Sequence, residues 1–151
     1  MTFPERNLSP MTTSTNPKFP DLMRVCAKDS EFFSPEKGLL RRILAHNEKM
    51  MLVEHRMEAT WVGARHSHPH DQMVYVLAGR LQFFCGQDEF EARAGDSFVL
   101  RGGVEHSART LGEPAIVLDV FAPYREDYVR GGAASAGKAN DGPERAAQAN
   151  R

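Results

Sequence analysis

Glycines divide the middle of this chain into short apolar segments. Between residues 39 and 130 they stand at Gly63, Gly79, Gly86, Gly95, Gly102, Gly103 and Gly112. None of the intervening segments is long enough to argue for a helix, whereas short apolar runs bounded by turn residues are typical of β-strands. The spacing of the glycines therefore predicts an all-β fold.

The apolar segments predict nine strands. They cover residues 39–45, 50–57, 59–62, 72–78, 81–85, 89–93, 97–100, 106–110 and 115–121. The segments 72–77 and 116–121 are apolar, or nearly so, at both odd and even positions, which suits strands covered on both faces in a sandwich or barrel. We expect a closed double-sheet jelly roll, with one short helical turn over residues 30–37 at its start.

The two ends of the chain lack the residues needed for a packed core. The first twenty residues contain four prolines and six serines or threonines, and residues 131–151 contain no Val, Ile, Leu, Met or aromatic residue. Such segments bury too little apolar surface to offset the entropy of ordering them. We therefore expect a flexible N-terminal arm (1–30), one β-barrel domain (31–130) and a disordered C-terminal tail (131–151).

The balance of charge limits the classes of partner. The chain has 19 Lys and Arg against 20 Asp and Glu, so it has no broad basic field for nucleic acid or an anionic membrane. No apolar run reaches the length that crosses a bilayer, and no signal peptide is recognisable, which predicts a cytoplasmic location. Cys26 and Cys85 form no Cys-x-x-Cys pair and are expected to be ordinary thiols.

The most informative feature for function is a cluster of histidines. His66 and His68 stand two residues apart, so on an extended segment both side chains point to one face, and Gln72 at the head of the next strand can join them. His106 would come from a neighbouring strand. Imidazole and amide ligands suit a divalent transition metal such as Zn, Ni, Fe or Mn, and four of them leave positions for water or substrate. The pattern predicts a metal site with an open coordination position.

Two longer patterns carry these residues. The first is His66-x-His68-x3-Gln72-x6-Gly79, and the second is Gly95-x7-Gly103-x2-His106. Together they resemble the two motifs of the cupin superfamily. The resemblance implies a double-stranded β-helix in which His66, His68, Gln72 and His106 hold the metal. His70 falls outside the motif and is expected on the surface or behind the ligands.

The chain departs from the general cupin pattern at three positions. Gln72 replaces the usual glutamate, Arg101 the usual proline and Thr110 the usual terminal asparagine. With a neutral amide the ligand set has no formal negative charge, so the ion keeps its full positive charge toward the substrate. We expect such a site to favour Lewis-acid polarisation of an anionic substrate over redox chemistry with oxygen.

The resemblance extends over residues 39–128. The segments 66–72, 75–80, 95–97, 104–106 and 119–128 are similar to those of the KdgF family of small single-domain cupins, in which a glutamine ligand is usual. That family converts 4,5-unsaturated uronates, the monosaccharides left by pectin and alginate lyases, into linear keto sugars. The resemblance therefore implies a metal-dependent enzyme with an acidic sugar as its substrate.

Three further residues are candidates for catalysis. Asp119 and Phe121 share one face of a strand by parity, and Arg125 follows just beyond it. By resemblance they are active-site residues: Asp119 as general acid or base acting at C4 or through water at C5, Arg125 as a clamp for the carboxylate, and Phe121 as a pocket wall. Alternatively, Asp119 is a satisfied buried carboxylate, Phe121 is plain core, and Arg125 pairs with Glu126 or Asp127 at the surface.

Other functions remain open on the sequence alone. A metal-dependent dioxygenase would use nearly the same ligands, a non-catalytic module would bind a sugar or metal, and a storage or structural barrel would hold no functional metal. The acidic sugar is favoured by Asp119 and Arg125. His55 has no partner in any motif. We also expect a homodimer formed at a sheet edge, with residues 39–45 as the candidate edge.

Overall fold

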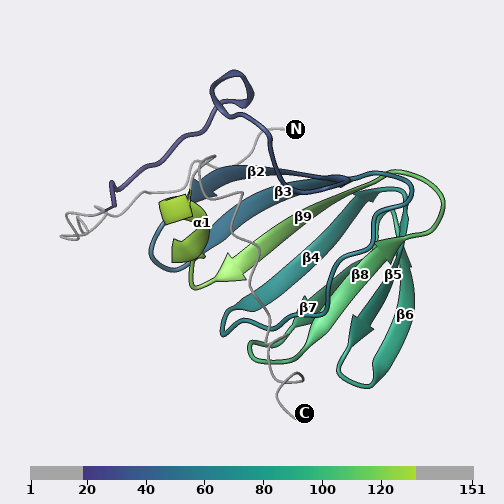
Figure 1. Ribbon diagram of the computed structural model, residues 1–151. Helices are drawn as coiled ribbons and strands as arrows, with labels where there is room; N and C mark the ends of the chain where they lie inside the picture. The colour runs from purple at the N-terminus through teal and green to yellow at the C-terminus, as the bar shows by residue number, and fades with distance from the viewer. Residues whose placement is uncertain (1–18, 132–151) are drawn as a thin grey trace, which may run out of the picture.

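The fold consists of two antiparallel sheets. The computed structural model describes residues 19–131 (Figure 1). One sheet has the order β1-β2-β3-β9-β4-β7 and the other the order β6-β5-β8. The strands are β1 (Phe33–Glu36), β2 (Leu39–His46), β3 (Met51–Met57), β4 (Asp71–Ala78), β5 (Arg80–Cys85), β6 (Asp88–Arg93), β7 (Ser97–Leu100), β8 (His106–Thr110) and β9 (Ala115–Ala122). The expected all-β double-stranded β-helix is confirmed.

Two short helical elements lie at the ends of the strand array. A 3-10 helix (Ala27–Asp29) precedes β1, and α1 (Glu126–Gly131) follows β9. Figure 1 shows α1 beyond one end of β2, β3 and β9, at the end where β9 finishes. No helix within residues 19–131 has the length and hydropathy needed to span a membrane.

Most predicted strands agree with the structure to within a residue, with two exceptions. Residues 59–62 form no strand, and only Val62 makes an isolated bridge, to Arg109. The prediction of a helical turn over residues 30–37 is wrong, because Phe33–Glu36 pairs antiparallel with β2. Pro35 has no N–H to donate, and a proline is tolerated in a strand at the edge of a sheet, which is where β1 lies.

The core lies between the two sheets. The main cluster of buried apolar side chains comprises Leu39, Met57, Val74, Val76, Leu81, Phe83, Ala92, Leu100, Ala115 and Val117. A smaller cluster of Met51, Val53 and Phe121 lies where the tyrosines of the C-terminal region, Tyr124 and Tyr128, pack against the barrel. Phe121 of this second cluster also contacts the ring of His68, one of the predicted metal ligands.

The outer face of β4 is less covered than its sequence predicts. Its inward residues Val74 and Val76 are fully buried, but Met73, Tyr75 and Leu77 are each about half exposed. The expectation that both faces are covered is therefore wrong for β4, whereas the outward residues of β9 are partly buried. The proposed edge is wrong as well, because β2 pairs with β1 on one side and β3 on the other.

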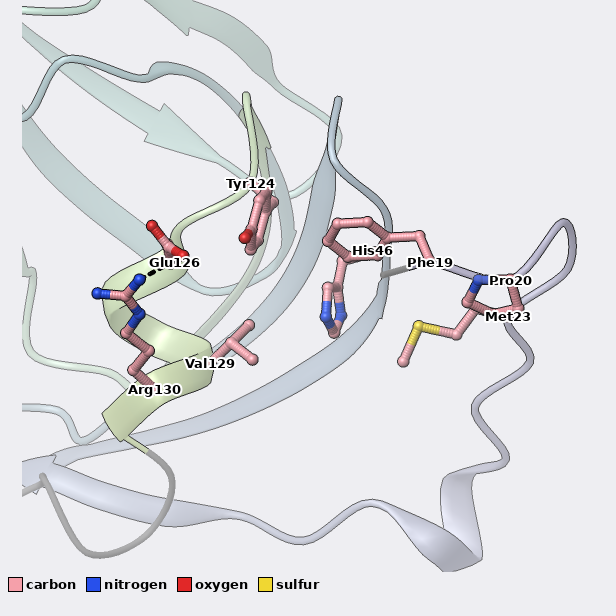
Figure 2. A pocket seen from close by; sticks show the side chains of 8 residues that line it. All are labelled: Phe19, Pro20, Met23, His46, Tyr124, Glu126, Val129 and Arg130. Atoms are coloured by element: carbon pink, nitrogen blue, oxygen red, sulfur yellow. Dashed lines mark hydrogen bonds and ion pairs between the residues drawn. The ribbon is translucent and has the colours of Figure 1, made fainter. Parts of the chain in front are cut away.

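The expected flexible arm and tail fall mostly on residues 1–18 and 132–151, which lie outside the described part of the chain. Of the arm, Phe19 packs edge-to-face on Tyr124, with ring centroids 5.2 Å apart. This contact forms one side of a largely apolar pocket of about 460 Å³. Figure 2 shows that α1 supplies the opposite side, with Val129 and Arg130. His46 lies between α1 and Phe19.

The turn at Gly79 offers a test of the barrel's packing. Gly79 has φ of +78°, and a Cβ there would stand 2.2 Å from the carbonyl oxygen of Pro114. Gly112 has a similar φ of +80° with nothing within 4 Å. We expect Gly112→Ala to lower the free energy of unfolding by about 1 to 2 kcal/mol, the conformational cost alone. Gly79→Ala should cost clearly more, as measured by urea denaturation. Equal losses would contradict a close approach at Pro114.

Candidate functional site

Three histidines from two distant segments converge in the barrel. His66 makes an isolated antiparallel bridge with His106, the first residue of β8, with paired backbone hydrogen bonds of 3.0 and 2.9 Å. His68 lies between that bridge and β4. One ring nitrogen from each of the three lies within 4.8 Å of the others. The structure thus brings together the three histidines that the sequence predicts as ligands.

Two hydrogen bonds from backbone N–H groups of the turn after β7 hold the loop that carries His68. The Gly103 N–H donates to the carbonyl oxygen of His68 at 2.7 Å, and the Gly102 N–H donates to the carboxylate of Asp71 at 2.8 Å. A Cβ on Gly102 would stand 2.1 Å from the carbonyl oxygen of Pro69. The glycine pair therefore lets two backbones approach closely and fixes the position of His68.

The tautomer of each histidine is set by its own backbone. Nδ1 of His66 and Nδ1 of His106 lie 3.0 and 2.8 Å from the carbonyl oxygen two residues earlier, and Nδ1 of His68 lies 3.0 Å from the one two residues later. A carbonyl oxygen only accepts, so each Nδ1 carries the proton and each Nε2 presents a lone pair. The buried Nε2 of His106 has no hydrogen-bond partner in the structure. This is the arrangement of imidazoles prepared to bind a metal.

Gln72, the fourth ligand that the sequence predicts, turns its side-chain oxygen toward His68. Its Nε2 donates to Oδ1 of Asp119 at 2.9 Å, which turns Oε1 toward Nε2 of His68, 3.1 Å away. Burial, helped by the positive charge of Arg125, lowers the pKa of His68 to about 4, so this ring is neutral at neutral pH. Two acceptors then face each other, and a metal ion bound by both removes the repulsion. The residues present therefore fit a metal.

Asp119 is buried beside this ligand set. It lies on the inward face of β9 and is 3% exposed. Its Oδ1 accepts from Gln72, and its Oδ2 lies 2.6 Å from Nδ1 of His55 on β3. Phe121, on the same face, packs edge-to-face on the ring of His68 with centroids 5.6 Å apart. The predicted positions of Asp119 and Phe121 next to the metal ligands are thus found in the structure.

His55 is the residue that sequence reasoning missed. A signal was present: His55 stands at the same parity as Val53 and Met57, which are both buried on the inward face of β3. A histidine on such a face needs a polar partner. The partner could not be identified, because Asp119 is 64 residues away in the chain.

Arg125 lies over the site between β9 and α1. Its guanidinium makes two hydrogen bonds to the carboxylate of Asp127, at 2.9 and 2.7 Å, as one alternative from the sequence anticipated. The guanidinium carbon also stands 5.2 Å from the ring centre of Phe121 and 4.2 Å from that of Tyr128. Arg125 is therefore a mostly buried cation that faces the site, and Asp127 orients it.

His70 is not one of the three histidines whose ring nitrogens converge, as its position outside the motif predicts. Its ring centroid is 5.6 Å from that of His68, and its Nδ1 is buried without a hydrogen-bond partner. Burial and the charge of Arg125 lower its pKa. His70 therefore lies beside His68 but outside the group of three converging ring nitrogens.

Comparison with known proteins finds similarity to cupins. A family model described as "Cupin domain" matches residues 53–121. The "Pectin degradation protein KdgF" of Dickeya dadantii (strain 3937) is 27% identical over 93 residues, which cover 61% of this chain and 84% of that protein. Among solved structures, an RmlC-like cupin from Shewanella frigidimarina NCIMB 400 superposes with a TM-score of 0.67, at 29% identity over 72% of this chain and 96% of its own. KdgF from Halomonas sp. gives a TM-score of 0.65, at 29% identity over 70% of this chain and 98% of its own.

The geometry predicts which histidine substitutions remove the metal. We expect wild type to bind one divalent transition ion and His106→Ala to weaken binding by more than about a hundredfold, because a ligand is lost. His70→Ala is the matched control and should keep the metal content of wild type. Elemental analysis and zinc titration of the untagged protein would measure both. Loss of the metal in His70→Ala alone would contradict the assigned ligands.

The pKa of His68 predicts how the stability of the metal-free protein changes with pH. Folding lowers this pKa from 6.5 to about 4, so between these values the unfolded chain binds the proton and the folded chain does not. The free energy of unfolding should therefore fall as the pH falls from 6.5 to 4, and this contribution is fully present above 6.5. Urea denaturation after chelation would measure it. His68→Gln should show a shallower fall, and an unchanged slope would contradict the prediction.

Proposed function

Since this chain belongs to the cupin superfamily, we propose that it is a metal-dependent enzyme that converts 4,5-unsaturated uronates from pectin or alginate breakdown into linear keto sugars. The observation that carries the proposal is the joining of Asp119, through the side chain of Gln72, to the three histidines. This contact places an acid–base group directly beside the predicted metal ligands. Similarity to two proteins named KdgF, one of them described as a pectin degradation protein, supports the substrate class.

The cofactor in this proposal is a divalent transition metal held by His66, His68, Gln72 and His106. Three neutral imidazoles and an amide oxygen suit Zn, Ni, Fe or Mn. When bound, such an ion supplies Lewis-acid stabilisation of negative charge on substrate oxygens. The ligand set itself is neutral, so it does not offset that positive charge.

Arg125 would bind the carboxylate of the sugar acid. A guanidinium matches a carboxylate in bidentate geometry, and Asp127 already holds this one in a fixed orientation. Phe121 lies beneath it and gives the sugar an apolar surface. A cation above an apolar wall beside the metal ligands is the arrangement that an acidic sugar needs.

Asp119 would move the proton. Each of its oxygens is already in a hydrogen bond, and in this proposal it acts as the base at the start of the reaction. We infer that it takes the proton of the C1 hydroxyl as the bond between C1 and the ring oxygen breaks, which gives the aldehyde at C1 and an enolate at C5. The protonated Asp119 then delivers this proton to C4, which converts the enolate to the ketone at C5. The reaction is an isomerisation and needs no oxidant or reductant.

Removal of the Asp119 carboxylate tests this role. We expect Asp119→Asn to lower kcat by at least about a hundredfold, the usual contribution of general acid–base catalysis, while the metal content stays at the wild-type level. The assay follows the ultraviolet absorbance of the double bond conjugated to the carboxylate, using uronates made with a pectin or alginate lyase. Asp96→Asn, at an exposed turn, is the control.

The outcome for wild type decides between functions. Loss of the double bond that is stopped by a chelator supports the uronate reaction. No acceleration by metal-loaded wild type would overturn it. Oxygen-consumption assays would then test the dioxygenase, and sugar-binding measurements the non-catalytic module.

Arg125 should affect binding more than turnover. We expect Arg125→Gln to raise KM by more than about tenfold, because a charge-assisted hydrogen bond to the carboxylate is lost, with a smaller change in kcat. Arg93→Gln, on the exposed surface, is the matched control. A KM equal to that of wild type would contradict the clamp.

We also propose that the chain forms a homodimer through the outer surface of β4 and β7. The outward side chains of Met73 and Val99 are cross-strand neighbours on β4 and β7, and both are more than half exposed. With Tyr75 and Leu77 they form an uncharged apolar surface that a second copy could cover. Sedimentation equilibrium of the full chain would give the oligomeric state.

A further inference from the structure

A second hydrogen-bonded chain leads away from Asp119 on the side opposite the metal ligands. His55, on β3, is 7% exposed. Its Nδ1 lies 2.6 Å from Oδ2 of Asp119, and its Nε2 accepts from Nε of Arg41 at 2.9 Å. Arg41 and His55 are directly opposed residues of β2 and β3, so the register of these strands fixes the contact. The metal motif contains neither residue.

The donor at Arg41 decides where the proton of His55 lies. An arginine Nε–H can only donate, so Nε2 of His55 must present its lone pair. The imidazole proton is then on Nδ1, where it is donated to Asp119. The side chains that hydrogen-bond to this ring are Arg41 from β2 and Asp119 from β9, and Tyr128 from α1 faces Arg41. His55 is thus a neutral donor, not an imidazolium.

We propose that Arg41 and His55 are positioning residues that hold Asp119 for proton transfer. Arg41 fixes the Nδ1–H tautomer of His55. His55 then donates to Oδ2 of Asp119, and Gln72 donates to Oδ1. The part of this inference that concerns turnover rests on the proposed function, whereas the tautomer of His55 does not.

Holding both oxygens has two consequences. The plane of the carboxylate is fixed relative to the metal ligands, and because Oδ1 is an acceptor, the amide of Gln72 must point its nitrogen at Asp119 and its oxygen at His68.

The same chain reaches the C-terminal helix. The guanidinium carbon of Arg41 stands 4.0 Å from the ring centre of Tyr128 on α1, and that of Arg125 stands 4.2 Å from the same ring. Cation–π contacts of this kind are favourable when the ring is largely removed from water. One partly buried tyrosine thus contacts both Arg41 and the proposed substrate clamp.

Nuclear magnetic resonance tests the tautomer without any substrate. Zinc-loaded protein with ¹⁵N-labelled histidine would be studied by long-range ¹H–¹⁵N correlation at neutral pH, with His55 assigned from the signal missing in His55→Asn. We expect neutral His55 with its proton on Nδ1. In Arg41→Met the Nε2–H form should gain population, whereas the matched Arg93→Met should match wild type. A wild-type His55 protonated on Nε2, or on both nitrogens, would overturn the proposal, as would an unchanged spectrum in Arg41→Met.

Kinetics test the positioning role. His55→Leu removes the donor to Asp119, whereas the amide nitrogen of His55→Asn stands near the position of Nδ1 and can replace it. We expect His55→Leu to lower kcat by about ten- to a hundredfold with KM and metal content near wild type, and His55→Asn to recover most of the loss. Equal losses in the two variants, or a change in KM alone, would overturn the role. If wild type does not turn over the uronate, the proposed function fails, and the resonance experiment still decides the tautomer.

Discussion

A carboxylate buried on an apolar strand face is the constraint on which the rest of the site depends. An ionised group removed from water is costly unless hydrogen-bond donors surround it. Asp119 meets this requirement with donors from two other strands, His55 on β3 and Gln72 on β4, the neighbours of β9 in the sheet. The strand order therefore does more than close the barrel, because it supplies both donors.

The metal ligands follow from this arrangement and from the local backbone. Asp119 fixes the amide of Gln72, so the ligand oxygen faces the histidines. Each histidine is fixed separately by a carbonyl oxygen within two residues of itself. Both kinds of contact orient a ligand before any ion is bound, which reduces the entropy lost on binding. Gln72 donates to Asp119 and is also the proposed fourth metal ligand, so one side chain would serve both groups.

Much of the fold and part of the site could be predicted from the sequence. The strands β7 and β8 were predicted with their observed bounds, because glycines or a turn stand close to both ends. The edge strand β1 was mistaken for a helical turn, since a proline in a short polar segment gives no period-2 signal. The outer surface of β4 was expected to be covered, because apolar residues on both faces do not reveal whether the cover comes from the same chain or from another.

The sequence by itself determined the ligand spacing: on extended backbone, residues two apart share a face, which is a local property that places His66 beside His68. The tertiary structure alone decided the partners of Asp119. Its contact with His55 spans 64 residues, and the link from His55 to Arg41 depends on the register of β2 with β3. Register is set by the packing of the whole inward face and by the strand order, so no short stretch of sequence contains it.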